Sequence, residues 1–211
     1  MLMIAQKQLL SINQVTYHYH GHLLFSDLSF SLTNGERIII TGHNGSGKSS
    51  LLRLISGLAT PIEGTIHWND NCIMSNPAYY RSRHFIGHLH GLKEGLTVTE
   101  NLTLLLMLHQ KGSNHQEEEC LAYFSLTSVA KRLVSQLSAG QKRRLALLKL
   151  LLIDKPLWIL DEPFTSLDAE TQNILKRLMN KHCETGGMIV MSSHHPIDSH
   201  TKSTYHLCLS S

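Results

Sequence analysis

The most informative part of the sequence is Gly42-His43-Asn44-Gly45-Ser46-Gly47-Lys48-Ser49, which fits the pattern G-x-x-x-x-G-K-[ST]. Before it, Ile38-Ile39-Ile40 is a continuous β-branched run typical of a buried parallel strand. After it, residues 49–56 are expected to form a helix that Gly57 closes. The glycines let backbone N–H groups point at phosphate oxygens, and the helix N-terminus adds its positive dipole end. The stretch therefore predicts a phosphate-binding loop in an α/β core.

The polar side chains of this loop have distinct expected roles. Lys48 is expected to bridge the β- and γ-phosphates and so to act as a catalytic cation, while the Ser49 hydroxyl holds Mg²⁺. ATP and Mg²⁺ are therefore the expected cofactors. The residues predicted to contact the nucleotide here are Gly42, His43, Asn44, Gly45, Ser46, Gly47, Lys48, Ser49 and Ser50. A chance glycine-rich turn is the alternative, but the strand, the loop and the helix all favour the first interpretation.

A second apolar run, Leu157-Trp158-Ile159-Leu160, is followed by the acids Asp161 and Glu162. At the end of a buried strand, Asp161 can reach Mg²⁺ directly or through water. Glu162 can act as the general base that polarises the attacking water. The alternative is a strand followed by an ordinary acidic turn, which the phosphate loop upstream disfavours.

The composition argues against several other classes of protein. The 211 residues are 42% hydrophobic, which suits one large domain or two small ones. The formal net charge of +3 is too weak to indicate nucleic-acid binding. The four cysteines form no C-x-x-C, and most of the 15 histidines lie outside metal-ligand spacing, which leaves zinc chemistry unsupported. Residues 1–10 do not resemble a secretory signal, and the longest apolar stretch, 145–160, is interrupted by charges, so we expect a soluble chain.

The segment Leu137-Ser138-Ala139-Gly140-Gln141 closely resembles the LSGGQ signature of the ATP-binding cassette family and departs from it only at Ala139. Ser138 is expected to cap the helix that follows. In the family, the signature forms a second anion cradle that faces the γ-phosphate held by the other subunit. The positions that match it here are Ser138, Gly140 and Gln141. The resemblance thus implies a homodimer that holds ATP in a head-to-tail sandwich.

The resemblance covers nearly the whole chain and implies the family's fold. That fold is an α/β P-loop NTPase nucleotide-binding domain with a mostly parallel core sheet. Alternating apolar and polar residues across 10–40 predict its N-terminal antiparallel β subdomain. We expect residues 1–211 to form one such domain, with a helical subdomain inserted at about 89–145. A second cassette, a C-terminal regulatory domain and a long coiled-coil insertion are not expected.

Three further positions take roles from the resemblance. Ser166-Leu167-Asp168 resembles the family's D-loop, which lines the dimer interface, and Asp168 is its residue predicted to contact the nucleotide. His194 resembles the switch histidine that contacts the γ-phosphate, with the adjacent His195 as the alternative. Tyr19 resembles the aromatic residue that stacks on adenine, and the spacing to residues 27–29 favours it over Tyr17. Both tyrosines could instead simply pack on the sheet.

His88 departs from the family pattern. Cassettes usually carry glutamine at the end of the strand that enters the helical subdomain, whereas Phe85-Ile86-Gly87-His88 places a histidine there. Its titratable ring could contact the water shell of Mg²⁺ or the γ-phosphate, which makes it a candidate metal-site and catalytic residue. A loop histidine that only helps the turn is the alternative.

The short length, the signature and the region around His88 resemble the cassettes of cytochrome c maturation, the haem exporter type. That resemblance implies integral membrane subunits as partners, a peripheral position on the cytoplasmic face of the inner membrane, and no nucleic acid. A groove within residues 88–110 would receive a short helix of the membrane partner. The alternatives are the ATPase of another small-solute transporter and a soluble cassette ATPase that is not coupled to transport.

Overall fold

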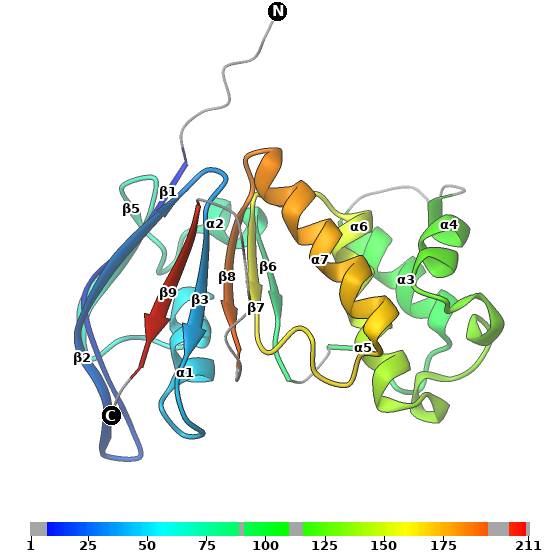
Figure 1. The fold of residues 1–211 in the computed structure, drawn as a ribbon, viewed down its shortest axis with the longest axis horizontal. Helices are drawn as coiled ribbons and strands as arrows, with labels where there is room; N and C mark the ends of the chain where they lie inside the picture. Colours follow the sequence, from blue (N-terminus) through cyan, green and yellow to red (C-terminus); the bar gives the residue numbers. More distant parts are fainter. Residues whose placement is uncertain (1–7, 89–90, 110–115, 194–202, 210–211) are drawn as a thin grey trace, which may run out of the picture. The chain divides into compact units, whose positions relative to one another are not determined.

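The computed structural model describes residues 8–88, 91–109, 116–193 and 203–209 (Figure 1). Its strands are β1 Leu9–Tyr19, β2 His22–Thr33, β3 Arg37–Thr41, β4 Glu63–Trp68, β5 Asn71–Cys72, β6 Arg83–Ile86, β7 Leu157–Leu160, β8 Met188–Ser192 and β9 Thr204–Cys208. Its helices are α1 Lys48–Ile55, α2 Pro77–Ser82, α3 Val98–Leu108, α4 Gln116–Tyr123, α5 Ala139–Leu147, α6 Lys149–Leu152 and α7 Ala169–Glu184, with short 3₁₀ turns at Thr127–Val129 and Val134–Gln136.

The chain divides into two compact units. The core unit comprises residues 1–85, 155–163 and 178–211, and the helical unit comprises residues 86–154 and 164–177. The helical unit contains the range of about 89–145 that the sequence predicts as an insertion. It also takes in the segment that follows Pro163 and the first half of α7.

Two sheets form the framework of the core unit. The antiparallel sheet has the strand order β2-β1-β4-β5, and the second sheet has the order β6-β7-β8-β3-β9. Strand β3 pairs in parallel with both β8 and β9, and β7 pairs in parallel with β8. The expected fold class, with an N-terminal antiparallel sheet and a mostly parallel core sheet, is therefore confirmed. The similarity to solved structures reported below supports the same conclusion.

The core of this unit is built from both sheets and α1. The Ile38-Ile39-Ile40 run is at most 4% exposed, as is typical of a strand in a parallel sheet whose two faces are both covered. Helix α1 contributes Leu51 and Ile55 to the same cluster as Leu10 of the antiparallel sheet and Val190 of β8. Burying one such side chain stabilises the fold by about 1.5–3 kcal/mol. This packing fixes the end of β3 and the start of α1, which hold the phosphate loop between them.

Local hydrogen bonds set the ends of two helices in the helical unit. Helix α3 begins at Val98, because Thr97 and Glu100 form a reciprocal capping box just before it. The Thr97 hydroxyl accepts from the Glu100 N–H at 3.2 Å, and the Glu100 carboxylate accepts from the Thr97 N–H at 2.7 Å. The helix that Ser138 caps ends at Leu147 and is separated from α6 by Leu148, whose N–H donates to the Leu145 carbonyl oxygen three residues back.

Among the described residues, no helix has the combined length and apolar character needed to cross a lipid bilayer.

Candidate functional site

The phosphate loop leaves the end of β3 and wraps tightly around Ser46. Gly42 has a φ of 147°, and a Cβ on it would come within 2.5 Å of the Ser46 hydroxyl oxygen and 2.6 Å of the Leu209 carbonyl oxygen. Any larger residue at this position would open the loop. Lys48 is folded back over the loop, where its Nζ donates to the carbonyl oxygens of Gly42 at 2.8 Å and His43 at 2.9 Å. The lysine ammonium, in a side chain only 6% exposed, thus lies directly above the loop backbone.

Several donors of this loop are suited to an anion. The Ser46 hydroxyl is buried and has no hydrogen-bond partner within the described parts of the chain. Helix α1 starts with Gly47 as its N-cap, with no side-chain cap and no acidic residue in its first turn. The first N–H groups of a helix need external acceptors, and a phosphate supplies them. Ser49 and Ser50 lie half-buried in this first turn.

The two acids predicted at the end of β7 are held by a residue of the neighbouring strand. The Ser192 hydroxyl donates to Oδ1 of Asp161 at 2.6 Å and accepts from the Glu162 N–H at 2.9 Å. Asp161 is 3% exposed and Ser192 is fully buried. Glu162 is half-buried and has a left-handed backbone with a φ of 46°. Such a conformation is uncommon outside glycine and turns the chain sharply after the strand.

The strand order brings the phosphate loop and the acid pair to the same edge of the sheet. Ile40 of β3 pairs with Ser192 of β8, and Leu160 of β7 pairs with Met191 of β8. The carboxyl ends of these three parallel strands are therefore neighbours, which is where ligands bind in open α/β sheets. The hydroxyl of Ser49 and the carboxylate of Asp161 are hard oxygen donors of the type that Mg²⁺ prefers. This donor set fits the predicted magnesium site.

The two candidate adenine-stacking residues have different surroundings. Tyr17 is half-buried and stacks on Phe25, with ring centroids 6.1 Å apart. Phe25 in turn lies against the phosphate loop, since a Cβ on Gly47 would be 3.1 Å from its ring. Tyr19 is 55% exposed at the end of β1, with His20 packed edge-on against it. Tyr17 thus already has an aromatic packing partner in the core unit, while a large part of Tyr19 is open to a ligand.

In the helical unit, the signature segment forms the start of α5. Ser138 is the N-cap, and its hydroxyl accepts from the Gln141 N–H at 3.2 Å while the Gln141 side chain accepts from the Ser138 N–H at 2.9 Å. A Cβ on Gly140 would lie 2.8 Å from the Ser166 carbonyl oxygen. Glycine is therefore needed here because the segment before α7 passes directly over the signature.

Asp168 caps the helix that follows this segment. Its Oδ1 accepts from the Thr171 N–H at 2.8 Å. The hydrogen bonds from Thr171 hold the pKa of the Asp168 carboxyl below its ordinary value, with a smaller contribution from the charge of Arg144. The carboxylate is therefore ionised at neutral pH and stays on the surface, next to the signature segment.

His88 lies two residues beyond the end of β6 and is exposed. The backbone just before it is anchored by Arg143 of α5, whose Nη1 donates to the Gly87 carbonyl oxygen at 3.1 Å. His194 and its alternative His195 lie outside the described residues.

Two residues of this arrangement were missed by the sequence interpretation. Ser192 carries a recognisable signal, because a polar residue ends the buried strand Met188–Ser192 just before the predicted switch histidine. Arg143 carries no signal of its own. Its neighbours Lys142 and Arg144 are half-buried, and nothing in a run of three basic residues indicates that the middle one is 3% exposed.

Comparison with known proteins decides the family. The model of the family described as ABC transporter matches residues 25–165. The chain belongs to the ABC transporter family. Among its curated relatives are proteins named cytochrome c biogenesis ATP-binding export protein CcmA. The one from Yersinia pseudotuberculosis is 41% identical over 88% of this chain and 86% of its own length. Those from Nitrosomonas europaea and Escherichia coli O157:H7 are 40% and 39% identical, over 90% and 91% of their own lengths.

Solved structures of this ABC family share the fold. A structure described as the ATP-binding subunit of an ABC transporter aligns with a TM-score of 0.78 at 30% identity, covering 88% of this chain and 79% of that one. A dimeric ATP-binding cassette in a post-hydrolysis state, bound to ADP and Pi, aligns with a TM-score of 0.75 at 27% identity, covering 88% of both chains. The fold of this chain is therefore that of an ATP-binding cassette.

Proposed function

We propose that this ABC family member is the ATP-hydrolysing subunit of a membrane exporter that serves cytochrome c biogenesis, the haem exporter type. The observation that carries the proposal is the 38–41% identity to export proteins of that name over 86–91% of their lengths. The phosphate loop and the acid pair provide the chemistry that an ATPase requires.

The core unit supplies one half of the proposed reaction. The loop N–H groups and the Ser46 hydroxyl bind the phosphates, and Lys48 turns from the loop carbonyls to the β- and γ-phosphates. Glu162 accepts a proton from the attacking water as that water adds to the γ-phosphorus, and ADP and Pi are released. Mg²⁺, held by Ser49 and Asp161, would neutralise charge on the phosphates. Tyr19 stacks on the adenine ring.

The helical unit supplies the other half, which acts on a second copy of the chain. Helix α5 begins within the signature, with Ser138 as its N-cap, and the first N–H groups of a helix are suited to bind an anion. In a head-to-tail homodimer, Ser138, Gly140 and Gln141 face the γ-phosphate on the partner, and Asp168 lines the interface. His88 and His194 contact the γ-phosphate of their own subunit.

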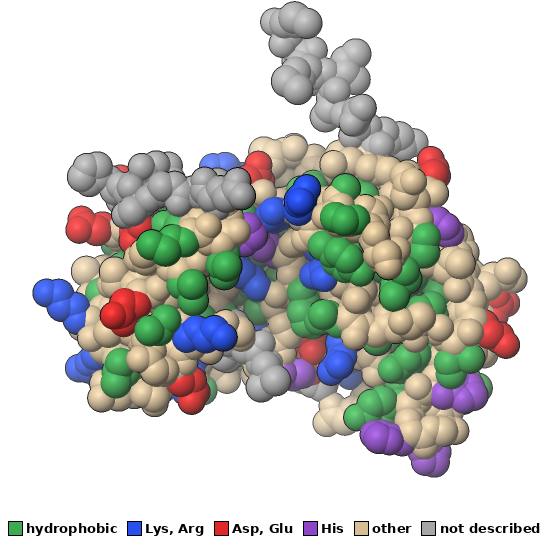
Figure 2. Space-filling model, turned by 180° about the vertical axis from the view of Figure 1, so that it is seen from behind, with side chains coloured by type: hydrophobic (Ala, Val, Ile, Leu, Met, Phe, Trp, Pro, Cys, Tyr) green, Lys and Arg blue, Asp and Glu red, His purple; other side chains and the backbone are tan. Residues whose placement is uncertain are grey.

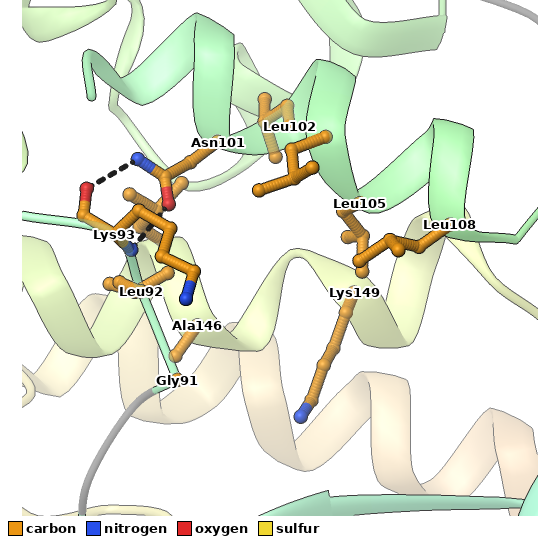
Figure 3. Close-up of a pocket in the computed structure, with 11 residues that line it drawn as sticks. Gly91, Leu92, Lys93, Asn101, Leu102, Leu105, Leu108, Ala146 and Lys149 are labelled. Atoms are coloured by element: carbon orange, nitrogen blue, oxygen red, sulfur yellow. Dashed lines mark hydrogen bonds between the residues drawn. The ribbon is translucent and has the colours of Figure 1, made fainter.

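The proposed membrane partner has a matching groove in the helical unit (Figure 3). Leu102, Leu105 and Leu108 of α3 form one wall, and the groove has a volume of about 160 Å³. An engineered cavity of about 150 Å³ accommodates one benzene molecule, so this groove has room for one or two apolar side chains. Asn101 holds its edge by pairing with the Lys93 backbone at 2.8 and 3.0 Å. A short apolar helix of the membrane subunit fits this shape.

The small net charge argues against a nucleic-acid partner. The formal net charge is +3, whereas nucleic-acid binding domains generally present a strongly basic face. Figure 2 shows lysine, arginine and acidic side chains interspersed on the face that it draws. The similarity to export proteins supports a location on the cytoplasmic face of the inner membrane, where we propose that the chain is bound peripherally to integral membrane subunits.

A genetic test addresses the cellular role. Removal of the gene from its host cells is expected to abolish c-type cytochrome assembly. The wild-type chain restores assembly, whereas a Lys48→Ala chain produced at the same level does not. Normal cytochrome assembly in the deletion strain would contradict the proposed role in cytochrome c biogenesis, while leaving the ATPase assignment intact.

A fractionation test addresses the groove. The chain is expected to sediment with membranes only when its membrane subunits are co-expressed. Leu108→Asp, at a side chain of the groove wall that is 73% exposed, is expected to abolish sedimentation without lowering the ATPase activity of the purified chain. Leu58→Asp is the matched control, because Leu58 is 55% exposed in the core unit. Equal sedimentation of the two variants would contradict docking at the groove.

A further inference from the structure

Arg143 is a charged side chain buried inside the helical unit. It lies in the second turn of α5, five residues after the signature serine, and is 3% exposed. Burying a guanidinium is costly unless hydrogen bonds and opposite dipoles compensate it. One compensating bond runs from its Nη1 to the Gly87 carbonyl oxygen at 3.1 Å. A residue kept at this cost is a candidate for a positioning role.

The partner of Arg143 is a specific point of the backbone. Gly87 lies between Ile86, the last residue of β6, and His88. A bond to its carbonyl oxygen therefore fixes the peptide unit that directly precedes His88. Through this bond, Arg143 is connected to His88 by the backbone.

Further bonds fasten the same two segments along their length. The Ser135 N–H donates to the Glu94 carbonyl oxygen at 3.1 Å, and the Val134 N–H donates to the Leu96 carbonyl oxygen at 2.9 Å. Gly87 and, further along the chain, Glu94 and Leu96 are thus each bonded to the segment that contains the signature. Arg143 makes the bond next to His88, and it does so with a side chain that is itself buried.

We propose that Arg143 is a positioning residue that makes the His88 turn and the signature helix move as one body. The inference rests on the proposed function, in which His88 contacts the γ-phosphate of its own subunit and Ser138 faces the γ-phosphate on the partner. The state of one nucleotide is then transmitted to the cradle that serves the other. Coupling of this kind needs a rigid element that can take two discrete positions. The two segments joined by these hydrogen bonds would form such an element.

Arginine suits this role better than other cations. Its planar group has five donors in a fixed fork, so one N–H can hold the Gly87 carbonyl while the others make further bonds. Lysine retains the charge but presents a single nitrogen on a flexible stem. Methionine retains the apolar stem and the helix propensity but has no donor.

The experiment is a double-mutant cycle on ATP turnover, made with the full chain. It compares the wild type, Arg143→Met, His88→Ala and the double variant, with ATP affinity and melting temperature measured for each. Arg143→Met is expected to lower turnover about tenfold, in the range for small misplacements of a catalytic group, and to leave ATP affinity within about twofold. Because Arg143 acts through His88, the double variant is expected to turn over no more slowly than the slower single variant.

Two further variants separate positioning from simple stability. Lys142→Met removes the exposed ion pair with Glu94, with Nζ and Oε1 2.7 Å apart, and is expected to keep turnover within about twofold of the wild type. Arg143→Lys is expected to recover part of the turnover that Arg143→Met loses. If Arg143→Met melts below the assay temperature, the cycle is run with Arg143→Lys in its place.

Three outcomes would overturn the inference. These are wild-type turnover in the folded Arg143 variant, wild-type turnover in His88→Ala, and losses that multiply in the double variant. Lys48→Ala in the same assay tests the proposed function separately. If Lys48→Ala is inactive while the losses multiply, only the role of Arg143 is wrong. If Lys48→Ala turns over normally, the proposed ATPase site itself is wrong.

Discussion

The Ser192 hydroxyl donates a 2.6 Å hydrogen bond to the buried carboxylate of Asp161. The same oxygen accepts the Glu162 N–H, so one side chain of β8 sets the positions of both acids. Ser192→Ala is expected to lower ATP turnover about tenfold or more, because a hydrogen bond to a charged group contributes about 1.5–3 kcal/mol. The matched control is Ser56→Ala, since Ser56 is equally buried but bonds the Arg53 carbonyl oxygen at the end of α1. Equal turnover in the two variants would show that Ser192 does not organise the acid pair.

Lys48→Ala is expected to reduce ATP turnover by at least about 100-fold, because it removes the cation that stabilises charge developing on the phosphates. The melting temperature is expected to change little. The bonds lost in the free protein are those from Nζ to the carbonyl oxygens of Gly42 and His43, and both lie on the surface loop. Turnover assays and thermal melts of the two proteins test both expectations. Unchanged turnover in Lys48→Ala would contradict the assignment of this segment as a phosphate-binding loop.

Ser138→Arg is expected to be inactive although Ser138 lies in the helical unit and Lys48 in the core unit. Ser138→Asn controls for loss of the helix cap, because asparagine is as good an N-cap as serine and leaves α5 intact. Mixing Ser138→Arg with Lys48→Ala subunits forms heterodimers with one intact composite site. Recovered turnover in the mixture, when neither variant is active alone, is the outcome expected for sites shared head-to-tail between two subunits.

His88→Ala is expected to leave ATP affinity nearly unchanged, since the phosphate loop provides most of the binding. Turnover falls moderately, and c-type cytochrome assembly in cells falls further. His88→Gln restores the residue that is usual in the family and is expected to recover much of both. Measuring affinity, turnover and assembly for the three proteins distinguishes this role from that of a loop histidine, for which alanine would match the wild type.

The features that the sequence predicts well are local. The phosphate loop is a contiguous pattern flanked by a strand and a helix, and β7 coincides with the apolar run expected for it. Asp161 is also predicted from a local pattern, because it directly follows the last residue of β7 in the sequence. The capping role of Ser138 is equally local, because a capping box needs only a four-residue segment.

The features that were missed depend on contacts between distant segments. Strand β9 has a mixed, partly exposed pattern, and it exists because its backbone pairs with β3, more than 160 residues earlier in the chain. The need for Gly140 comes from the Ser166 carbonyl oxygen, and the role of Ser192 comes from pairing between β8 and its neighbours. Helix α2 is different, because Asn76 followed by Pro77 is a local start signal that the sequence analysis could have used.

The central claim is that ATP joins two copies of this chain across composite sites. The most direct test is size-exclusion chromatography of Glu162→Gln with and without saturating MgATP. The substitution removes the proposed general base but keeps the size and the polar character of the side chain, so ATP is expected to bind and persist. We predict a dimer with MgATP and a monomer without it. A Glu162→Gln protein that binds ATP and still elutes as a monomer would contradict the head-to-tail sandwich.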